Sequence, residues 1–485
     1  MKEHWKVSVG LILSVITLVA CVNNKNEKAT ITIKSKTQLN SNVRIYHTKN
    51  IDEVQLAQTK TDSLGNCSFE VELRKPILAF IQTGEKIREI YLVPEYDLTI
   101  VENGKDYQTP LIFSGKGKKI NNCISWYNST FEKVRWGKGN LPDLTVDQFF
   151  NRLDSLKDIS ADLKKYYKDS VLTDNEITLL DNKSKFQILS FEQEYYFLRY
   201  NYSIYQKSEA LKSGGNYETK IGFTPNDVPL DTSFLAYSDY QRMLIFYWHN
   251  KVNLQTSELL IGSNDKYYLA PQISDSLIKT NKFPAGMREY VTAYNLNYWL
   301  NAYGITPVTD SVFADFKQTY IDSKYLPLLN TTYKSWLAVA PGSPAPDLEG
   351  TTLEGKRISL KDLKGKMIYM DVWATSCRPC VAEIPFSKKL QQQFSNEETI
   401  QFVNVSIDSD RSAWEKLLNN DKTWKGRHMI IDSEKIQEFY KNYKLFGIPS
   451  YILIDSSGKI IDIKAPRPSD KTINDIIRKL INERK

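Results

Sequence analysis

The sequence predicts a multi-domain protein with an N-terminal antiparallel β-sandwich, a middle all-α region and a C-terminal α/β region. The chain has 485 residues, and a domain usually holds about 100 to 200 residues. A chain of this length is therefore expected to fold into several domains, each with its own hydrophobic core. The spacing of apolar residues also changes twice along the chain, from alternation to helical spacing and then to a mixture of both. We place the three regions at residues 29–115, 120–339 and 342–485.

Short runs in which apolar and polar residues alternate fill the first region, as in residues 69–73. Such runs, separated by turn residues like those at 62–66, indicate antiparallel strands. Cys67 falls on the apolar face of one strand and is expected to be a core residue. Cys123 lies at an expected helix start after a glycine-rich turn. A bridge between these two cysteines is possible on this pattern, but two buried thiols are favoured.

The middle region has helical spacing throughout. Thr145 and Gln148 form a capping-box pattern that predicts a helix start. The apolar positions expected to follow it on one face are Phe149, Leu153, Leu156, Ile159, Leu163 and Tyr166. The same spacing predicts helices within residues 176–200, 237–248, 287–300 and 312–336.

The middle region is also rich in aromatic residues, which include Tyr195, Tyr196, Tyr200, Phe246, Tyr247, Trp248, Tyr298 and Trp299. These rings could line a binding groove, but packing in a core is the favoured interpretation. His47 and His249 lack the spacing of a metal-binding motif, so neither is expected to ligate a metal.

The helical pattern ends in the Pro- and Gly-rich residues 341–347, where we place a domain boundary. Beyond it strands and helices alternate. Strands are expected at 367–372, 400–407, 450–455 and 459–463, and helices at 379–394, 412–418, 434–440 and 470–481. This order predicts a mixed sheet covered by helices on both faces.

The first 20 residues predict an export signal. Lys2 and Lys6 precede an apolar run over residues 7–20, which is shorter than the about 20 residues that span a bilayer. Residues 18–21 read Leu-Val-Ala-Cys and resemble the lipobox of bacterial lipoproteins. The resemblance implies that Cys21 is the lipidated mature N-terminus, followed by a linker over residues 21–28, and that lipid alone anchors the protein to a membrane. The alternative is a plain cleavable signal.

The net charge and the number of cysteines limit the classes of function that the sequence supports. The formal net charge of +7 is small for this length and gives no support for nucleic-acid binding. Five cysteines are present; if Cys21 carries lipid, the remaining four include one close pair. Disulfides form and persist outside the cytoplasm, so a close pair in an exported protein suggests redox chemistry.

That close pair is Cys377 and Cys380, at the expected start of a helix. Unpaired backbone N–H groups and the helix dipole stabilise a thiolate there, which makes Cys377 the expected nucleophile. Arg378 favours the same charged form. Cys380, one helical turn later and more enclosed, is the expected resolving thiol, which attacks the mixed disulfide and releases the product.

Residues 371–380, Asp-Val-Trp-Ala-Thr-Ser-Cys-Arg-Pro-Cys, together with the Gly-Ile-Pro at 447–449, resemble the thioredoxin family. The Ala-Pro-Asp at 345–347, residues 360–366 and Glu383 resemble its exported TlpA/ResA branch. The resemblance covers about residues 342 to 485 and implies a thioredoxin fold. It also implies that Pro449 is cis beside the cysteine pair, leaving the Ile448 backbone free for an extended substrate.

The resemblance further implies roles for residues around the pair. Trp373, Arg378 and Ile448 are expected to contact substrate. Asp371 and Glu383 match buried acids of the family and are candidate proton acceptors for Cys380. Ser376 replaces the tryptophan common in this branch, so partner specificity does not transfer.

We therefore expect a membrane-anchored extracytoplasmic thiol-disulfide oxidoreductase, of the protein disulfide reductase type, which faces the periplasm. Its expected partners are disulfide-containing proteins or small thiols and a membrane thiol electron donor, and no bound cofactor or metal is needed. A zinc site would need a second ligand pair, which the neighbouring sequence lacks. Two alternatives stay open: a binding lipoprotein with an accessory redox domain, and a peroxiredoxin-like antioxidant. The spacing of Thr375 and Cys377 does not match a peroxiredoxin motif.

Overall fold

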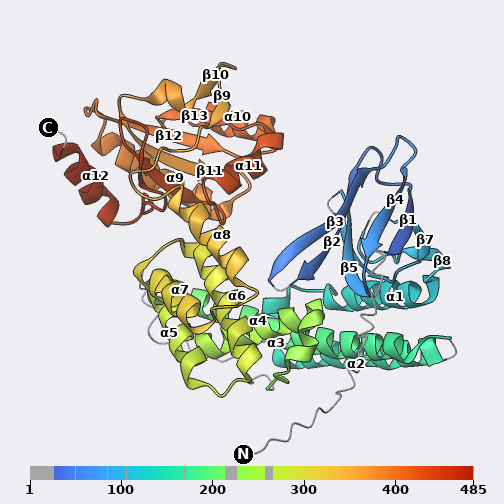
Figure 1. Ribbon diagram of the computed structural model, residues 1–485. Helices are drawn as coiled ribbons and strands as arrows, with labels where there is room; N and C mark the ends of the chain where they lie inside the picture. The colour runs from blue at the N-terminus through green and yellow to red at the C-terminus, as the bar shows by residue number, and fades with distance from the viewer. Residues whose placement is uncertain are drawn as a thin grey trace, which may run out of the picture.

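The computed structural model describes residues 27–49, 51–84, 86–104, 106–168, 171–212, 227–256 and 266–483. Figure 1 shows a β-rich N-terminal region, a helical middle region and a C-terminal α/β region, with the helical region joining the other two. The predicted signal segment and Cys21 lie outside the described residues. Among the helices within them, none is both long and apolar enough to cross a membrane.

Two four-stranded sheets form the N-terminal region. The first has the order β4 (Asn66–Leu73), β1 (Glu27–Ser35), β7 (Asp97–Glu102) and β8 (Ile112–Lys116). The second has the order β3 (Asp52–Lys60), β2 (Asn42–Lys49), β5 (Ile77–Thr83) and β6 (Lys86–Leu92). Apolar residues of both sheets, such as Ile31 and Ile81, belong to one buried cluster. Full burial of each such side chain stabilises the fold by about 1.5 to 3 kcal/mol.

Two expectations for this region need correction. The pairing is not wholly antiparallel, because β1 and β7 run parallel to each other. Between these strands the chain forms β2 and β3 of the second sheet, β4 of the first sheet and β5 and β6 of the second sheet, before β7 runs in the direction of β1. Strand β1 also begins at Glu27, inside the expected linker over residues 21–28. Cys67 and Cys123 are free thiols, as favoured, and Cys67 is only half-buried.

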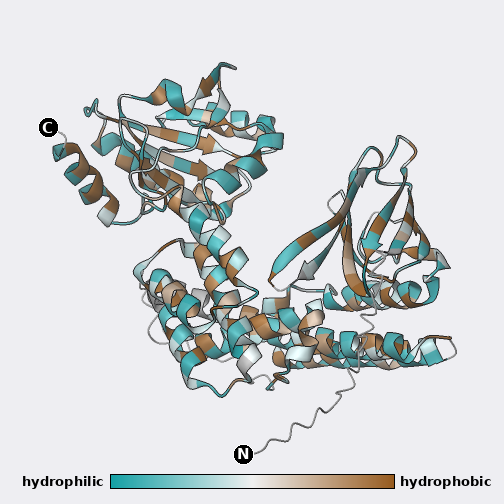
Figure 2. Cartoon of the chain, in the orientation of Figure 1, coloured by the Kyte–Doolittle hydropathy of each residue, from teal (hydrophilic) through white to brown (hydrophobic). Residues whose placement is uncertain are grey.

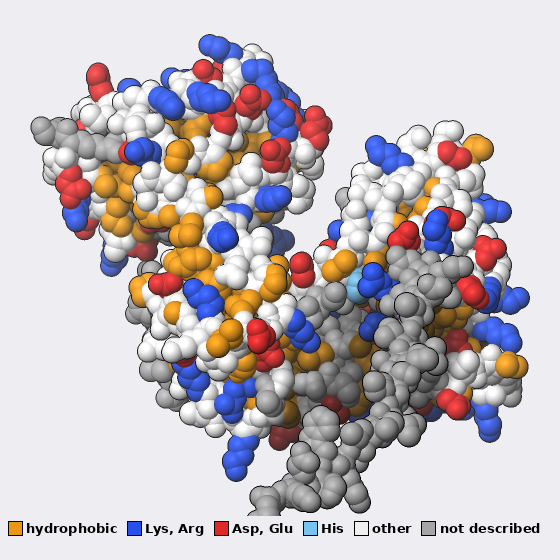
Figure 3. All heavy atoms as spheres, viewed as in Figure 1, with side chains coloured by type: hydrophobic (Ala, Val, Ile, Leu, Met, Phe, Trp, Pro, Cys, Tyr) orange, Lys and Arg blue, Asp and Glu red, His pale blue; other side chains and the backbone are white. Residues whose placement is uncertain are grey.

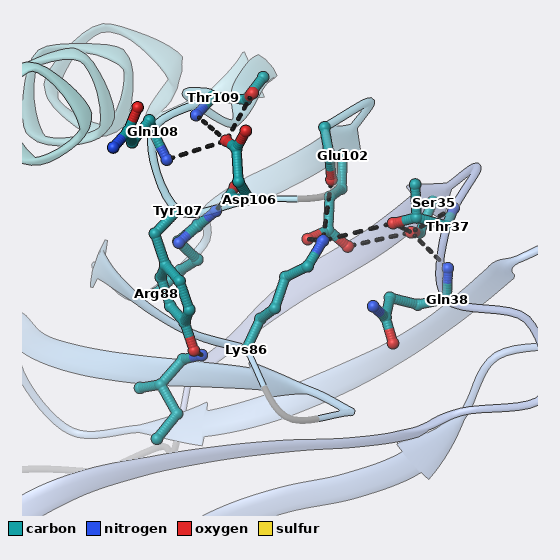
Figure 4. A network of polar contacts seen from close by, with 12 residues as sticks. Ser35, Thr37, Gln38, Lys86, Arg88, Glu102, Asp106, Tyr107, Gln108 and Thr109 are labelled. Carbon is teal, nitrogen blue, oxygen red and sulfur yellow. Dashed lines mark hydrogen bonds and ion pairs between the residues drawn. The ribbon is translucent and has the colours of Figure 1, made fainter. Parts of the chain in front are cut away.

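A polar network joins the two sheets at one end (Figure 4). The Lys86 ammonium of β6 donates to Glu102 of β7 at 2.9 Å and to the carbonyl of Gly104 at 2.8 Å. Ser35 of β1 donates its hydroxyl to the other oxygen of Glu102 at 2.9 Å. Both charged side chains are at least nine-tenths buried. Removing one partner would leave a buried charge uncompensated, at a cost of about 3 to 5 kcal/mol, so we interpret this network as structural.

The middle region is helical, as predicted. Its helices are α1 (Lys118–Arg135), α2 (Val146–Lys168), α3 (Asp174–Lys212), α4 (Ser238–Thr256), α5 (Lys266–Thr280), α6 (Ala285–Tyr303), α7 (Pro307–Thr319) and α8 (Leu326–Leu337). The predicted capping box is present, with reciprocal hydrogen bonds of 2.9 and 3.2 Å between Thr145 and Gln148. Tyr166 is exposed, contrary to prediction, and Tyr167 is buried in its place. Tyr167 lies four residues after Leu163 and therefore on the same helix face.

The predicted helix over residues 312–336 is in fact two helices. Helix α7 ends at Thr319, and α8 begins after a turn with Pro327 in its first turn. The sequence pattern also missed α5, which contains Pro271. The aromatic residues of this region mostly pack in its core, as favoured. Those that are buried are Tyr195, Tyr196, Tyr200, Trp248 and Trp299.

The C-terminal region has a mixed sheet, as predicted, but with seven strands where four were expected. Its order is β10 (Arg357–Ser359), β9 (Glu349–Thr352), β13 (Arg427–Ile430), β12 (Ile400–Ser406), β11 (Met367–Trp373), β14 (Ser450–Ile454) and β15 (Ile460–Asp462). Strands β11, β12 and β13 are parallel, and β14 is antiparallel to β11. Hydrophobic residues are frequent along the inner strands (Figure 2), and every residue of β11 is buried. The helices are α9 (Arg378–Gln393), α10 (Arg411–Asn420), α11 (Ile436–Asn442) and α12 (Thr472–Asn482).

Candidate active site

The cysteine pair lies where the central strand β11 passes into helix α9. Cys377 is the N-cap of α9, and its sulfur accepts the backbone N–H of Cys380 at 3.2 Å. A disulfide joins the two residues, whose Cα atoms are 5.2 Å apart. Cys377 is half-exposed, whereas Cys380 is only 3% exposed. The first sulfur is therefore the one that a substrate disulfide can reach, and it lies where a helix N-terminus stabilises a thiolate.

The loop before Cys377 is fixed by a carboxylate that the sequence pattern did not single out. Asp408 accepts the backbone N–H of Thr375 at 2.9 Å and its hydroxyl at 2.6 Å. Its second oxygen accepts the hydroxyl of Ser406 at 2.7 Å. Asp408 is only 8% exposed. Hydrogen bonds to a buried carboxylate are strong, so this contact holds the loop that leads into the nucleophile.

The peptide bond between Ile448 and Pro449 is cis, the isomer that the family resemblance implied. Pro449 directly precedes β14, the neighbour of β11 in the sheet. Ile448 and Cys377 both pack against the cluster that contains Trp373 and Cys380. The cis-proline loop and the nucleophile therefore border the same apolar patch.

Asp371 is buried within β11, six residues before Cys377. Its Oδ1 atom has no hydrogen-bond partner among the described residues. Burial, and secondarily the charge of Glu383, raise the pKa of Asp371 to about 8. A carboxyl group with such a pKa can gain and lose a proton near neutral pH, which a general acid-base group must do.

Glu383 lies one helical turn after Cys380 on α9, and it is only 8% exposed. Its two oxygens accept the backbone N–H of Ser469 at 3.0 Å and the Ser469 hydroxyl at 2.7 Å. Ser469 comes from the segment before α12 and was not anticipated from the sequence. The structure thus places Asp371 on the strand before the cysteine pair and Glu383 on the helix that carries it, with Glu383 held in position by hydrogen bonds.

The three expected substrate contacts differ in exposure. Arg378 is exposed and Ile448 is half-buried, so both can meet a substrate. Trp373 is only 1% exposed and packs edge-on against Trp424, with 4.8 Å between ring centroids. The structure therefore puts Trp373 in the core beneath the motif. A tryptophan at the end of a strand buried on both faces has no free side to offer a substrate.

The remaining cysteines of the described chain are poor nucleophiles. Burial raises the pKa of Cys67 and that of Cys123 to about 11. Both thiols therefore stay protonated at neutral pH, and the thiolate is the reactive form. Within the described residues, no group of three or more His, Cys, Asp or Glu side chains has the arrangement of a metal site.

Comparisons with known proteins agree with this chemistry. Residues 340–478 match the family model described as Redoxin. The thiol-disulfide oxidoreductase ResA of Bacillus anthracis is 31% identical over 121 residues, which cover 25% of this chain and 67% of the relative. The thioredoxin-like protein YneN of Bacillus subtilis is 30% identical over 136 residues, or 28% of this chain and 78% of the relative.

Solved structures are also similar to the C-terminal region. The crystal structure of the thioredoxin domain of a thiol-disulfide oxidoreductase from Bacteroides vulgatus is 29% identical, with a TM-score of 0.27. It covers 30% of this chain and 99% of that chain. The Redoxin match, the relatives and the cysteine pair beside a cis-proline agree on one assignment: the chain belongs to the ResA-like family of thiol-disulfide oxidoreductases.

Proposed function

We propose that this enzyme is a protein disulfide reductase that acts outside the cytoplasm and is held at a membrane by lipid on Cys21. The difference in accessibility between Cys377 and Cys380 carries the chemical part of the proposal. An accessible sulfur at a helix N-terminus can attack a substrate, and a buried sulfur one turn away can then resolve the product.

The reaction proceeds in two exchanges from the dithiol form. The Cys377 thiolate attacks one sulfur of the substrate disulfide; a mixed disulfide forms, the substrate S–S bond breaks, and the second substrate sulfur leaves as a thiolate. Cys380 then loses its proton to a carboxylate and attacks Cys377, which releases the first substrate sulfur. The substrate gains two electrons, its two thiolates take up the Cys380 proton held by the carboxylate and one proton from solvent, and the cysteine pair becomes the disulfide seen in the structure. A thiol donor at the membrane must then reduce the pair again.

The residues around the pair support these roles. Asp371, whose pKa is raised to about 8, is the proposed proton acceptor for Cys380, and Glu383 assists it by its negative charge. Arg378 is exposed beside the nucleophile and favours its thiolate. Ile448 precedes β14 in sequence and lies outside the strand, so its backbone can pair with an extended substrate segment.

The reducing direction rests on Pro379 between the two cysteines, which resembles the reducing members of the family. The test is the reduction potential of the Cys377/Cys380 couple, obtained by equilibration with thiol-disulfide buffers. We expect a value close to that of thioredoxin, about −270 mV. A value near that of the oxidant DsbA, about −120 mV, would reverse the proposed direction of electron flow.

The location rests on the sequence of residues 1–21, with its basic start, short apolar run and cysteine. On this basis the mature enzyme is a cell-envelope lipoprotein that faces the periplasm. Its proposed partners are disulfide-containing proteins or small disulfides, and a membrane thiol electron donor. We further interpret the two N-terminal sheets as a β-sandwich, because their buried residues share one cluster.

A further inference from the structure

The helical and C-terminal regions are packed against each other through a common core. Ile460 of β15 is 1% exposed and belongs to the buried cluster formed by helices α3 to α8. Ala345 and Ile463 of the C-terminal region pack against the same cluster. The segment between the two regions also pairs with β15, since Gly342 donates its N–H to Ile460 and Ile460 donates its N–H to Ser343, both at 2.8 Å. The helical region therefore has a fixed position beside the redox region.

Helix α6 contacts the C-terminal region at two positions. The carbonyl of Ala302 accepts the ammonium group of Lys464. One turn earlier, the ring of Tyr298 meets the ring of Phe446 edge to face, with 5.9 Å between centroids and an interplanar angle of 89°. Residues four apart lie on the same face of a helix. This face of α6 is consequently the one turned toward the C-terminal region.

Phe446 lies next to the cis-proline loop. It is three residues before Pro449 in the sequence, and its side chain is 63% exposed. Ile448, between them, packs against the same apolar cluster as Cys377. An apolar strip therefore leads from the nucleophile through Ile448 and Phe446 to Tyr298 of the helical region. Figure 3 shows hydrophobic side chains on the viewed face where the two regions meet.

The strip continues behind Tyr298 as a series of ring contacts. His249 of α4 lies 5.4 Å from Tyr298, and Phe197 of α3 lies 5.5 Å from His249, measured between ring centroids. These contacts pack the Tyr298 ring against His249 and, through it, against Phe197, so helices α4 and α3 support the rim that Tyr298 forms with Phe446. A large, exposed aromatic ring on a packed support is typical of a protein-binding site.

We propose that Phe446 and Tyr298 form a docking surface for an extended segment of a protein substrate, and that they select a large apolar side chain near the cysteine under attack. The inference rests on the proposed exchange function, because the mixed disulfide with Cys377 fixes the position of the substrate cysteine. An extended chain advances about 3.3 to 3.6 Å per residue. Phe446 lies two positions before Ile448, with Gly447 between them, so a side chain about three residues from the substrate cysteine is placed to reach the aromatic rim.

The test uses the full-length mature chain and three disulfide substrates. Two are peptides whose single cysteine is joined to a small thiol by a disulfide. They differ only at the position three residues from that cysteine, which is phenylalanine in one peptide and alanine in the other. The third is the small molecule bis(2-hydroxyethyl) disulfide. The measured quantity is kcat/KM for each peptide divided by that for the small disulfide. We expect the wild type to favour the phenylalanine peptide by about two- to tenfold, as one aromatic contact would give.

Phe446→Ser and Tyr298→Leu should bring the ratio between the two peptides close to one. The matched control is Ile321→Ser, a similarly exposed apolar residue in the turn between α7 and α8, which should keep the wild-type ratio. Analytical ultracentrifugation of the wild type and of Phe446→Ser measures their masses in solution and shows whether the rim instead joins two copies of the chain. An equal mass for the two proteins supports substrate docking.

Three results would overturn the inference. They are a wild type that treats both peptides alike, a Phe446→Ser variant that keeps the aromatic preference, and a wild-type dimer that Phe446→Ser converts to a monomer. Failure of the wild type on the small disulfide would overturn the exchange function itself, and the docking surface with it. A wild type that reduces the small disulfide but shows no preference between the two peptides would overturn only the docking surface.

Discussion

Ser469 donates both its backbone N–H and its hydroxyl to the carboxylate of Glu383, at 3.0 and 2.7 Å. Asp371, the other buried acid of the site, has an oxygen without a hydrogen-bond partner in the described chain. The two carboxyl groups therefore have different environments. Glu383 is oriented by donors, whereas burial and the charge of Glu383 raise the pKa of Asp371 to about 8. This difference makes Asp371 the better candidate for carrying a proton.

The first prediction concerns the pH dependence of the resolving step. Asp371 can accept the Cys380 proton only when its carboxyl group is ionised. The ionised form becomes abundant as the pH rises through about 8. Resolution in the wild type should therefore accelerate with pH and level off above this value. Asp371→Asn should slow resolution at pH 8 by about tenfold or more. Stopped-flow measurement of mixed-disulfide decay tests this, and unchanged decay in the variant would remove Asp371 from the mechanism.

Glu383→Gln offers a second prediction with a defined sign. It removes the negative charge that contributes to the raised pKa of Asp371, so that pKa should fall. Burial is the larger cause and persists, so the pKa should stay above the usual range for aspartate. The pH profile of resolution should shift to lower pH in Glu383→Gln. A profile that does not move would show that the two carboxyls are not coupled.

The third prediction concerns stability. Asp371 binds its proton more tightly in the folded chain than in the unfolded chain, because its folded pKa is raised. Its contribution to stability is thus fully present below about pH 4 and is lost as the pH rises through about 8. Asp371→Asn should therefore be more stable than the wild type at pH 8, by an amount on the order of a few kcal/mol. The difference in stability between the variant and the wild type should become small toward pH 4.5.

Thermal denaturation of the full chain at both pH values measures this difference. Glu398→Gln is the control, because Glu398 is an exposed acid of the same region and its replacement should not change the pH dependence. An Asp371→Asn variant that is less stable than the wild type at pH 8 would contradict the expectation.

The fourth prediction tests the carboxylate that holds the loop before the nucleophile. Asp408→Ala leaves the Thr375 N–H and the hydroxyls of Thr375 and Ser406 without their acceptor. A small displacement of a reacting group is costly, so attack by Cys377 should slow by about tenfold or more. Asp408→Asn keeps an accepting oxygen and should recover part of the rate. Asp410→Ala is the matched control, because Asp410 is the N-cap of α10 and accepts the N–H and hydroxyl of Ser412 there. Equal rates in the two alanine variants would assign Asp408 no positioning role.

The sequence was informative where function depends on local spacing. Cys377 and Cys380 are one turn apart at a helix start, and the Gly-Ile-Pro at 447–449 is continuous, so a short motif contains the information. The residues that form hydrogen bonds to the site from distant parts of the chain could not be predicted from such motifs. Ser469 is 86 residues from Glu383, and Asp408 is 33 residues from Thr375. Neither contact has a local signal in the sequence.

The errors in the fold have similar causes. Strands β9, β10 and β13 are three or four residues long, which is too short for an alternating pattern. The parallel pairing of β1 with β7 depends on the path of the chain between them and not on either strand. The burial of Trp373 follows from the position of β11 inside the sheet, where both faces are covered and periodicity cannot distinguish them.

The fifth prediction concerns the N-terminus. If Cys21 is the lipidated first residue, Cys21→Ala should release the protein from membranes or block its processing, because one cysteine carries the whole anchor. Fractionation of cells that express the wild type and the variant measures this, and mass spectrometry of the mature wild type identifies the modified residue. An unmodified N-terminus downstream of Cys21 would contradict the proposed anchor.

The last prediction separates the two thiols of the site. Attack needs an accessible thiolate, which the half-exposed Cys377 at the start of α9 provides, whereas release needs the buried Cys380 within reach of it. Cys377→Ser should therefore lose nearly all exchange, by about a thousandfold or more, because the nucleophile itself is gone. Cys380→Ser should still attack and then stall as a covalent adduct through Cys377.

That adduct should survive non-reducing electrophoresis, and mass spectrometry of it should identify the natural partner. Cys67→Ser and Cys123→Ser are the controls. Burial raises the pKa of both thiols to about 11, so neither should take part and both variants should exchange at the wild-type rate. If Cys380→Ser traps no protein from its native compartment, or if Cys377→Ser keeps its exchange activity, the roles of nucleophile and resolving thiol are assigned wrongly. The half-exposed sulfur at the helix start would then have to serve another purpose.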